Sequence, residues 1–235
     1  MQGGGGASTP SLLHMTFQDS FQNGLQQAKK NLKPALIIWG IGLSLTLLCT
    51  FNESVRGLVE SLVDIRKKND PWFTIIVFAT AGAVVPFIIE QFTLEPEKRD
   101  SVKGLAVKAA LWAANGIATK YVFKFLDEFV GEKRTPANVT SKVFLDQGLY
   151  VLLVTTPIIT FLYLWAGNDL ETRATKQALE KKPFRFRYLE TYMANITVWF
   201  VAAFIMFSAP AGASIIFAMI MLAFWGIILG TMSRD

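Results

Sequence analysis

The chain has little of the two residues that most often carry chemistry: one cysteine, Cys49, and one histidine, His14, in 235 residues. A single cysteine excludes a disulfide within the chain. It also leaves too few ligands for most metal sites, and one histidine makes histidine-assisted nucleophiles improbable. No phosphate-binding loop is present either. The sequence therefore argues against an enzyme, and no catalytic residue, metal or cofactor is predicted.

Charge is also sparse, whereas apolar residues are abundant. Charged residues make up 17% of the chain, hydrophobic residues make up 52%, and phenylalanine alone occurs 19 times. Several apolar stretches approach or exceed 18 residues, the length that identifies a membrane-spanning helix. The sequence therefore predicts an all-α, polytopic transmembrane helix bundle with about six spans and an N-terminal amphipathic helix.

Residues 1–33 are expected to form a flexible segment and then the amphipathic helix. The apolar residues Leu13, Phe17, Phe21 and Leu25 recur at a spacing of four, which places them on one helical face. Two placements suit this stripe. The helix either packs against the rest of the protein or lies in the membrane interface with lysines at headgroup level.

Residues 34–70 are expected to add one membrane helix, from Pro34 to Phe51, and an amphipathic connector along the membrane surface, from Glu53 to Asn69. Residues 71–235 are expected to form the remaining bundle, with a short polar helix over 169–182. The spans predicted there cover residues 71–94, 104–125, 143–165, 188–208 and 213–230.

Basic residues concentrate in two segments, and this asymmetry predicts the topology. Residues 1–33 carry three lysines against one aspartate, and residues 167–187 carry six basic residues against three acids. Four predicted spans separate the two segments, so both lie on the same side, as the positive-inside rule requires. The loops 52–71 and 127–142 balance to zero and share the opposite side.

Asp146 and Gln147 stand at the start of the predicted fourth span. A carboxylate in a first turn meets unpaired N–H groups, so Asp146 has one interpretation as a simple helix cap. The other interpretation is a polar group inside a bundle or pore. Pro157 is expected to kink this helix. An ion pair between Asp146 and Lys120 is also predicted, because the third span ends where the fourth begins.

Other polar residues lie in the second and third spans. Lysines near helix ends often extend to the membrane surface, and the alternative is a cationic face turned toward a pore. Alanines at a spacing of four in the third span favour close helix contact. Including Asp146 and Gln147, the candidate intramembrane site consists of Glu90, Gln91, Lys108, Lys120, Asp146 and Gln147.

Four basic residues near residue 185 flank a predicted span: Lys181, Lys182, Arg185 and Arg187. Attraction to anionic, cardiolipin-like lipid headgroups is the simplest interpretation of such a cluster. The same placement beside membrane spans gives no support to nucleic-acid binding.

Several motifs together resemble the Mpv/PMP-type family of small membrane proteins of peroxisomes and the mitochondrial inner membrane. The resemblance covers residues 71–230 approximately. It rests on Pro71-Trp72, Ile88-Ile89-Glu90-Gln91, Gly116, Leu126-Asp127, Asp146-Gln147, Ala209-Pro210 and Phe224-Trp225 at family-like spacings.

This resemblance implies a helical bundle without enzymatic activity, in a family discussed as solute channels of the mitochondrial inner membrane. Some family positions differ: Pro86-Phe87 stands where the family has Gly-Asp, and 70 residues precede the similar region. These differences favour an accessory subunit of a larger mitochondrial inner-membrane complex, in contact with lipids and other subunits. The alternative is a small-solute channel or transporter of the mitochondrial or peroxisomal membrane.

The predicted topology can be checked by labelling. Single cysteines introduced at Asn138 and at Lys176 are expected to react with a membrane-impermeant reagent from opposite sides, because an odd number of spans separates them. Labelling of both positions from one side would contradict the map.

Overall fold

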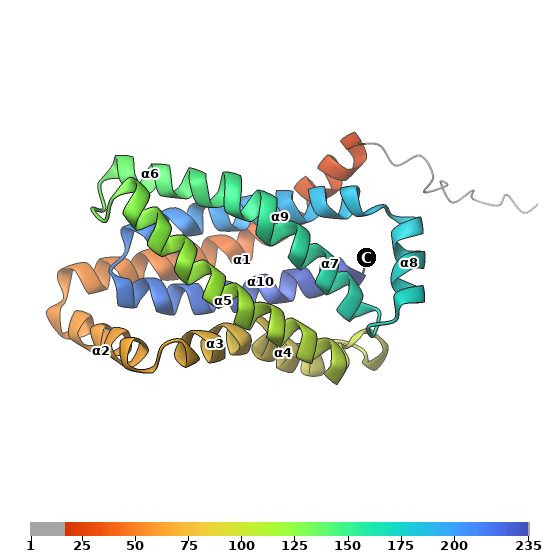
Figure 1. Cartoon of the computed structure of the whole chain (residues 1–235), viewed down its shortest axis with the longest axis horizontal. Coiled ribbons are helices and arrows are strands. Elements are labelled where there is room, and N and C mark those ends of the chain that lie inside the picture. Colours follow the sequence, from red (N-terminus) through yellow and green to blue (C-terminus); the bar gives the residue numbers. More distant parts are fainter. Residues whose placement is uncertain (1–16, 235) are drawn as a thin grey trace, which may run out of the picture.

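A computed structural model describes residues 17–234, and that part of the chain is built of helices that run side by side as an elongated bundle (Figure 1). The predicted all-α fold is confirmed. Successive long helices run in opposite directions along the bundle, which brings the loops 94–101 and 168–171 and the C-terminus to one end. The connections after residues 51, 130 and 208 lie at the other end.

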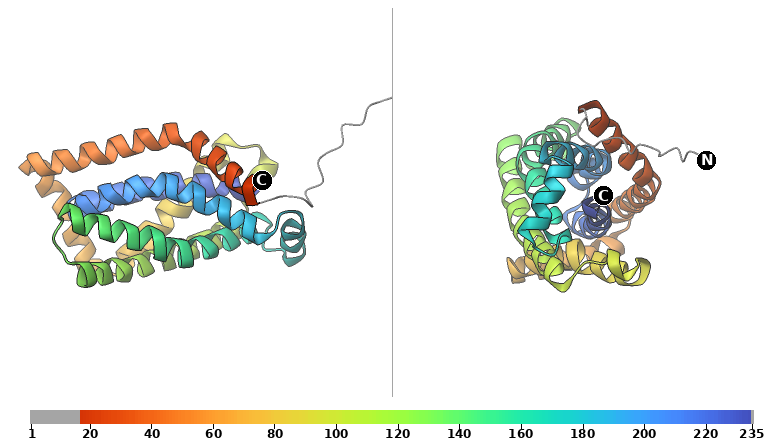
Figure 2. Two further views of the ribbon diagram at one scale, coloured as in Figure 1. Left: turned by 90° about the horizontal axis from the view of Figure 1, so that it is seen from above. Right: turned by 90° about the vertical axis from the view of Figure 1, so that its right-hand side faces the viewer.

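Helix α1 (Phe17–Phe51) is one continuous helix and includes Pro34. The predicted boundary at Pro34, between an amphipathic helix and a span, is therefore wrong. Proline removes one backbone hydrogen bond and bends a helix without necessarily ending it. The N-terminal part of α1 lies at an angle to the rest (Figure 2).

The start of α1 packs on the bundle. A Cβ atom on Gly24 would lie 2.7 Å from Cβ of Met193, and Asn23 donates a hydrogen bond to Glu190 at 3.3 Å. The start of α1 therefore packs through Asn23 and Gly24. Phe17 and Phe21 of the predicted apolar stripe are 69% and 38% exposed, so the stripe itself does not make this contact. Leu13, the first residue of that stripe, lies outside the described residues.

Helix α2 (Glu53–Asn69) matches the predicted connector. The side chain of Asn52 caps it by accepting a hydrogen bond from the Val55 amide at 3.1 Å. Val59 is buried against the beginning of α10, where Gly212 leaves room for the α2 backbone. The connector is thus anchored to the end of the bundle.

The next pass is continuous from α3 (Trp72–Ala79) through the π-helical segment η2 (Thr80–Val84) to α4 (Val85–Thr93). A short 3₁₀ turn, η3 (Pro96–Lys98), leads to α5 (Val102–Val130), which Ser101 caps through the Gly104 amide.

Helix α5 turns an unexpected face inward. Lys108 and Trp112 are buried in the bundle, whereas Ala106, Ala110 and Ala114, expected to make close helix contact, are exposed. Of the second expected pair, Ala109 packs against the core and Ala113 is half-buried. Large side chains with polar ends form hydrogen bonds or ion pairs inside the bundle, whereas burying the small alanine side chain contributes little free energy. The outward alanines at a spacing of four are Ala106, Ala110, Ala114 and Ala118.

The fourth pass begins seven residues before its predicted start. It comprises α6 (Pro136–Leu145), the π-helical segment η4 (Asp146–Thr155) and α7 (Thr156–Gly167). Thr135 caps α6 by accepting from the Asn138 amide at 3.3 Å. The interpretation of Asp146 as a first-turn cap is therefore wrong, because the residue lies about ten residues inside a continuous helix.

The chain ends with α8 (Thr172–Lys181), α9 (Phe184–Ser208) and α10 (Ala211–Arg234). Within the described range, five helices are long and apolar enough to cross a membrane, and they support a membrane protein. The sixth predicted span, α5, is not among them because its lysines lower its hydropathy, although it runs along the bundle beside them. The most enclosed of the five spans, α10, lies at the centre (Figure 2). These spans are Leu32–Phe51, Trp72–Thr93, Pro136–Gly167, Phe184–Ser208 and Ala211–Ser233.

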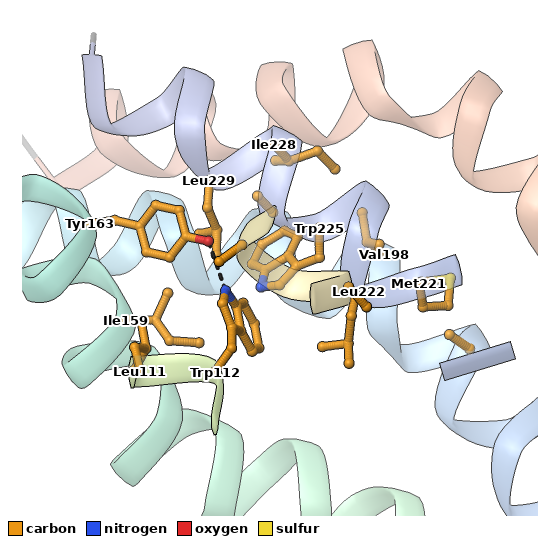
Figure 3. Packing of buried hydrophobic residues seen from close by; sticks show 14 of the residues in the cluster. Leu111, Trp112, Ile159, Tyr163, Val198, Met221, Leu222, Trp225, Ile228 and Leu229 are labelled. Carbon is orange, nitrogen blue, oxygen red and sulfur yellow. Dashed lines mark hydrogen bonds between the residues drawn. The ribbon is translucent and has the colours of Figure 1, made fainter. Parts of the chain in front are cut away.

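Aromatic and aliphatic side chains from several helices form the main core (Figure 3). Trp112 of α5, Tyr163 of α7 and Trp225 of α10 are each 2% exposed. Glycines let these rings approach the backbone closely: a Cβ on Gly82 would lie 2.4 Å from the indole of Trp112. Gly226 similarly contacts the carbonyl of Gly82.

Two glycines in α1 offer a matched test of this packing. A Cβ on Gly42 would lie 2.3 Å from the ring of Phe217, whereas a Cβ on Gly40 meets nothing within 4 Å. We expect Gly42→Ala to reduce the free energy of unfolding by about 1–3 kcal/mol through overpacking. Gly40→Ala is expected to leave it unchanged or raise it by up to about 1 kcal/mol. Thermal unfolding in lipid nanodiscs measures both, and equal losses would contradict the packing of α1 on α10.

Candidate functional site

A hydrogen bond from α9 stabilises the π-helical segment η4 (Asp146–Thr155). Pro157 follows it and has no N–H, so the carbonyl of Leu152, five residues earlier, loses its partner in this wide turn. The hydroxyl of Tyr188 donates a hydrogen bond to that carbonyl at 2.9 Å. In a membrane helix such a freed carbonyl must be satisfied by a neighbour. The contact therefore fixes the C-terminal part of η4 against α9.

A chain of hydrogen bonds starts at the beginning of η4. The amide of Asn195, on α9, donates to Gln147 Oε1 at 3.4 Å, and Gln147 Nε2 donates to Asp146 Oδ2 at 2.7 Å. The three side chains are between 3% and 7% exposed. Both amide donors point along the chain toward Asp146. The structure therefore agrees with the interpretation of Asp146 as a polar group inside the bundle.

These residues line a cavity of about 80 Å³, here called the chamber. Tyr150 and Asn115 add a further hydrogen bond in its wall, with the tyrosine hydroxyl 3.3 Å from Asn115 Oδ1. Thr119 and Thr155 complete its polar side. The aromatic residues that line the chamber are Phe78, Trp112, Phe123, Trp199, Phe207 and Trp225.

A second hollow of about 470 Å³, here called the vestibule, adjoins the chamber. The two share wall residues, among them Phe78, Thr119 and Phe123. The vestibule lies toward the end of the bundle where α5 ends and α6 begins. Its charged lining residues are Arg66, Lys120, Lys124, Asp127, Glu128, Glu132, Arg134 and Lys142.

Lys120 pairs with Asp70 at 2.5 Å, not with Asp146. The predicted Asp146–Lys120 pair is wrong because the fourth pass begins earlier than expected, which moves Asp146 deeper than the end of α5. The basic residue near that end, Lys142, pairs instead with Asp127 of α5. Asp146 itself has no lysine or arginine nitrogen within 4.0 Å among the described residues.

The Asp70 carboxylate lies in the connection between α2 and α3, outside the spans. Burial alone would raise its pKa, but hydrogen bonds from Lys120 and Thr74, together with the charges of Lys120 and Arg66, outweigh burial. The pKa of Asp70 is therefore lowered below its ordinary value, so this residue is an anion at neutral pH.

Lys108 and Glu90 belong to the opposite end of the bundle. Lys108 forms a buried ion pair with Asp100, and its ammonium group lies 4.6 Å from the centre of the Tyr163 ring. The interpretation of Lys108 as a residue that extends to the membrane surface is therefore wrong. Glu90 is 3% exposed. Its neighbour Gln91 is half-buried.

A layer of side chains separates this charged end from the chamber. The indole N–H of Trp112 donates to the Tyr163 hydroxyl at 2.8 Å, and that hydroxyl donates to the Gly82 carbonyl at 3.3 Å (Figure 3). The Gly82 carbonyl lies in the π-helical segment η2, about one turn before Pro86, and the Tyr163 hydroxyl gives it a donor from another helix. With Trp225 beside them, these residues form what is here called the central layer. The predicted site residues therefore do not meet in one place: only Asp146 and Gln147 line the chamber.

Two of the four predicted lipid-contact residues are used inside the protein. Arg187 is 9% exposed and donates to backbone carbonyls of Lys182 and Ala178, and Lys182 pairs with Glu190 at 2.5 Å. They turn inward because Glu190 is buried and needs a positive partner. Arg185 and Lys181 are exposed and stay candidates for headgroup contact.

Asn115, Tyr150, Thr155, Asn195 and Trp199 line the chamber and were not predicted from the sequence. A signal existed for two of them, since Asn115 and Asn195 are isolated amides in otherwise apolar segments. Polar residues within a span usually face protein or water rather than lipid. Tyrosine, threonine and tryptophan are too common in membrane helices to give such a signal.

No protein-family model, curated protein sequence or solved structure matches this chain. The resemblance to the Mpv/PMP-type family therefore stays a prediction.

The Asp70–Lys120 pair predicts a pH dependence of stability. Because folding lowers the pKa of Asp70, its contribution is present above the unfolded pKa of about 4 and is lost as pH falls through the folded value. Lys120→Met removes the main source of that lowering. We expect the gain in stability between about pH 2 and pH 5 to shrink by less than about 1 kcal/mol, since the Lys120 side chain is 37% exposed.

Thermal unfolding in nanodiscs across this pH range measures the effect. Lys124→Met is the matched control, because Lys124 and Glu128 are 3.7 Å apart and both largely exposed. The same pH profile for wild type and Lys120→Met would show that the pair does not lower the pKa of Asp70.

Proposed function

We propose that this membrane protein is a non-catalytic conduit for small polar solutes across an organelle membrane, with the chamber as its solute-binding site. The observation that carries the proposal is the hydrogen-bonded chain of Asn195, Gln147 and Asp146 around a cavity in the middle of the bundle. Buried ionisable groups in membrane helices are costly and usually mark a solute or ion path. The mitochondrial inner membrane is the proposed location, on the family resemblance alone.

The vestibule supports a path to the chamber from one end. It shares walls with the chamber, and its charged lining would keep it hydrated. From the other end, the hydrogen bond between Trp112 and Tyr163 stands in the way. We propose that this central layer is the gate, and that the structure corresponds to a state open toward the vestibule and closed beyond it.

An accessory subunit of a larger complex is the second candidate, and the outward face of α5 favours it. Ala106, Ala110 and Ala114 form a smooth exposed stripe along this helix, and Ala118 continues it. Small residues at a spacing of four let a second membrane helix approach closely. In that role the exposed Arg185 and Lys181 would contact anionic lipids of the surrounding membrane.

Flux into liposomes tests the conduit. Purified protein is expected to admit urea or glycerol slowly, and Tyr163→Phe is expected to raise the rate. Tyr163→Phe removes both hydrogen bonds of the Tyr163 hydroxyl, with Trp112 and with the Gly82 carbonyl. At about 1 kcal/mol each, their loss from the closed state corresponds to roughly thirtyfold in the rate. Stopped-flow light scattering measures the rates.

Tyr121→Phe is the control for that experiment, because Tyr121 is 64% exposed on the outer surface of α5. It is expected to leave flux at the wild-type rate. If neither wild type nor Tyr163→Phe admits any solute, the conduit fails and the accessory role is favoured.

A further inference from the structure

Asp146 is a buried acidic residue without a basic neighbour in the described part of the chain. It is 7% exposed, and no basic nitrogen of the described residues lies within 4.0 Å. The hydrogen bond from Gln147 uses Oδ2, which leaves Oδ1 for another donor. A charge inside a membrane bundle is costly unless an opposite charge accompanies it. Lys142, one turn earlier, cannot serve because it pairs with Asp127.

The aromatic lining of the chamber indicates what kind of cation would fit. Trp112, Trp199 and Trp225 present indole rings around the chamber, and tryptophan attracts organic ammonium groups more strongly than other aromatic residues do. A metal ion would instead require several hard oxygen ligands. Among the residues that the structure describes, no three acidic, histidine or cysteine side chains come together.

Two residues of the chamber wall carry polar atoms without a partner. Trp199 Nε1 and Thr155 Oγ1 are buried and make no hydrogen bond within the described part of the chain. Buried donors are almost always satisfied in native proteins, and an unsatisfied one costs free energy. An oxygen on a bound molecule would satisfy either of them after a small adjustment of the side chain.

We propose that the chamber binds a small protonated amine that also carries a hydroxyl or carboxyl oxygen, of the amino-alcohol type. The ammonium group binds Asp146 Oδ1 and lies against the tryptophan rings, and the oxygen accepts from Trp199. A cavity of about 80 Å³ suits a molecule of a few heavy atoms. This inference rests on the proposed conduit function, for which it names the class of solute.

Three probes of nearly equal size separate the parts of the proposal. Ethanolamine has both groups, ethylamine lacks the oxygen, and ethylene glycol lacks the amine. Titration calorimetry with the full-length protein in phosphatidylcholine nanodiscs is expected to rank them in that order, with no measurable binding of ethylene glycol. Ethylene glycol binding as tightly as ethanolamine, or binding of no amine at all, would overturn the proposal.

Substitutions then assign the contacts. Asp146→Asn is expected to weaken ethanolamine binding at least about tenfold, because a charge-assisted hydrogen bond becomes a neutral one. Trp199→Phe keeps an aromatic ring but removes the N–H, so it is expected to weaken ethanolamine binding about fivefold more than ethylamine binding. Asp169→Asn, an equal change of charge in the loop after α7, is the control. Unchanged binding in a folded Asp146→Asn variant would refute the site.

The amine has two possible sources, a free solute or a phosphatidylethanolamine headgroup. Replacing part of the phosphatidylcholine by phosphatidylethanolamine weakens ethanolamine binding if the headgroup enters the chamber, and has no effect if the free solute is the ligand; both outcomes support the site. Flux is measured separately. If ethanolamine binds but does not cross the membrane, the conduit is refuted and the amine site stands. If urea crosses but no amine binds, the amine site is refuted and the conduit stands.

Discussion

The hydrogen-bonded chain from Trp112 through Tyr163 to the carbonyl of Gly82 holds together three passes of this protein. A membrane helix must satisfy its backbone carbonyls within the protein, and the Tyr163 hydroxyl gives the Gly82 carbonyl of η2 a donor from another helix. The glycine also lets the indole approach the backbone closely. The central layer thus donates a hydrogen bond to a backbone carbonyl and at the same time fills the bundle between its two polar ends.

In the fourth pass, too, a tyrosine from another helix donates a hydrogen bond to a backbone carbonyl. Pro157 follows a π-helical segment, and Tyr188 from a neighbouring helix satisfies the carbonyl of Leu152. Each wide segment is therefore held by a tyrosine hydroxyl from another helix. The segment η2 faces the tryptophan core, and the segment η4 begins at Asp146. Each of them is followed by a proline, a residue that a soluble helix would rarely tolerate in its interior.

The charges inside the bundle are sorted by depth. Lys108 with Asp100, Lys120 with Asp70, and Lys142 with Asp127 form ion pairs near the two ends. Asp146 lies between these ends, with amide donors and aromatic rings as its neighbours. In the described part of the chain these three lysines have acidic partners, whereas Asp146 has no basic nitrogen within 4.0 Å.

Much of the fold could be predicted from the sequence, because crossing a membrane depends on a local sum of hydrophobicity. The connector at Glu53–Asn69 and the penultimate and last helices were expected within a few residues of their observed bounds. Two boundaries were missed for a physical reason. Pro34 bends α1 without ending it, and Pro136, a good first residue for a helix, begins the fourth pass well before its apolar stretch.

The sequence by itself determined that this is a helical membrane protein, and it indicated that Asp146 and Gln147 were a polar pair to examine. Only the tertiary structure decided that Asp146 faces a chamber, that Lys120 belongs to Asp70, and that the alanines of α5 face outward. In a membrane, lipid-facing and core-facing surfaces are equally apolar, so no periodicity records which face of a helix turns inward. That choice depends on contacts between helices far apart in the chain, such as Asn195 with Gln147 and Tyr163 with Gly82.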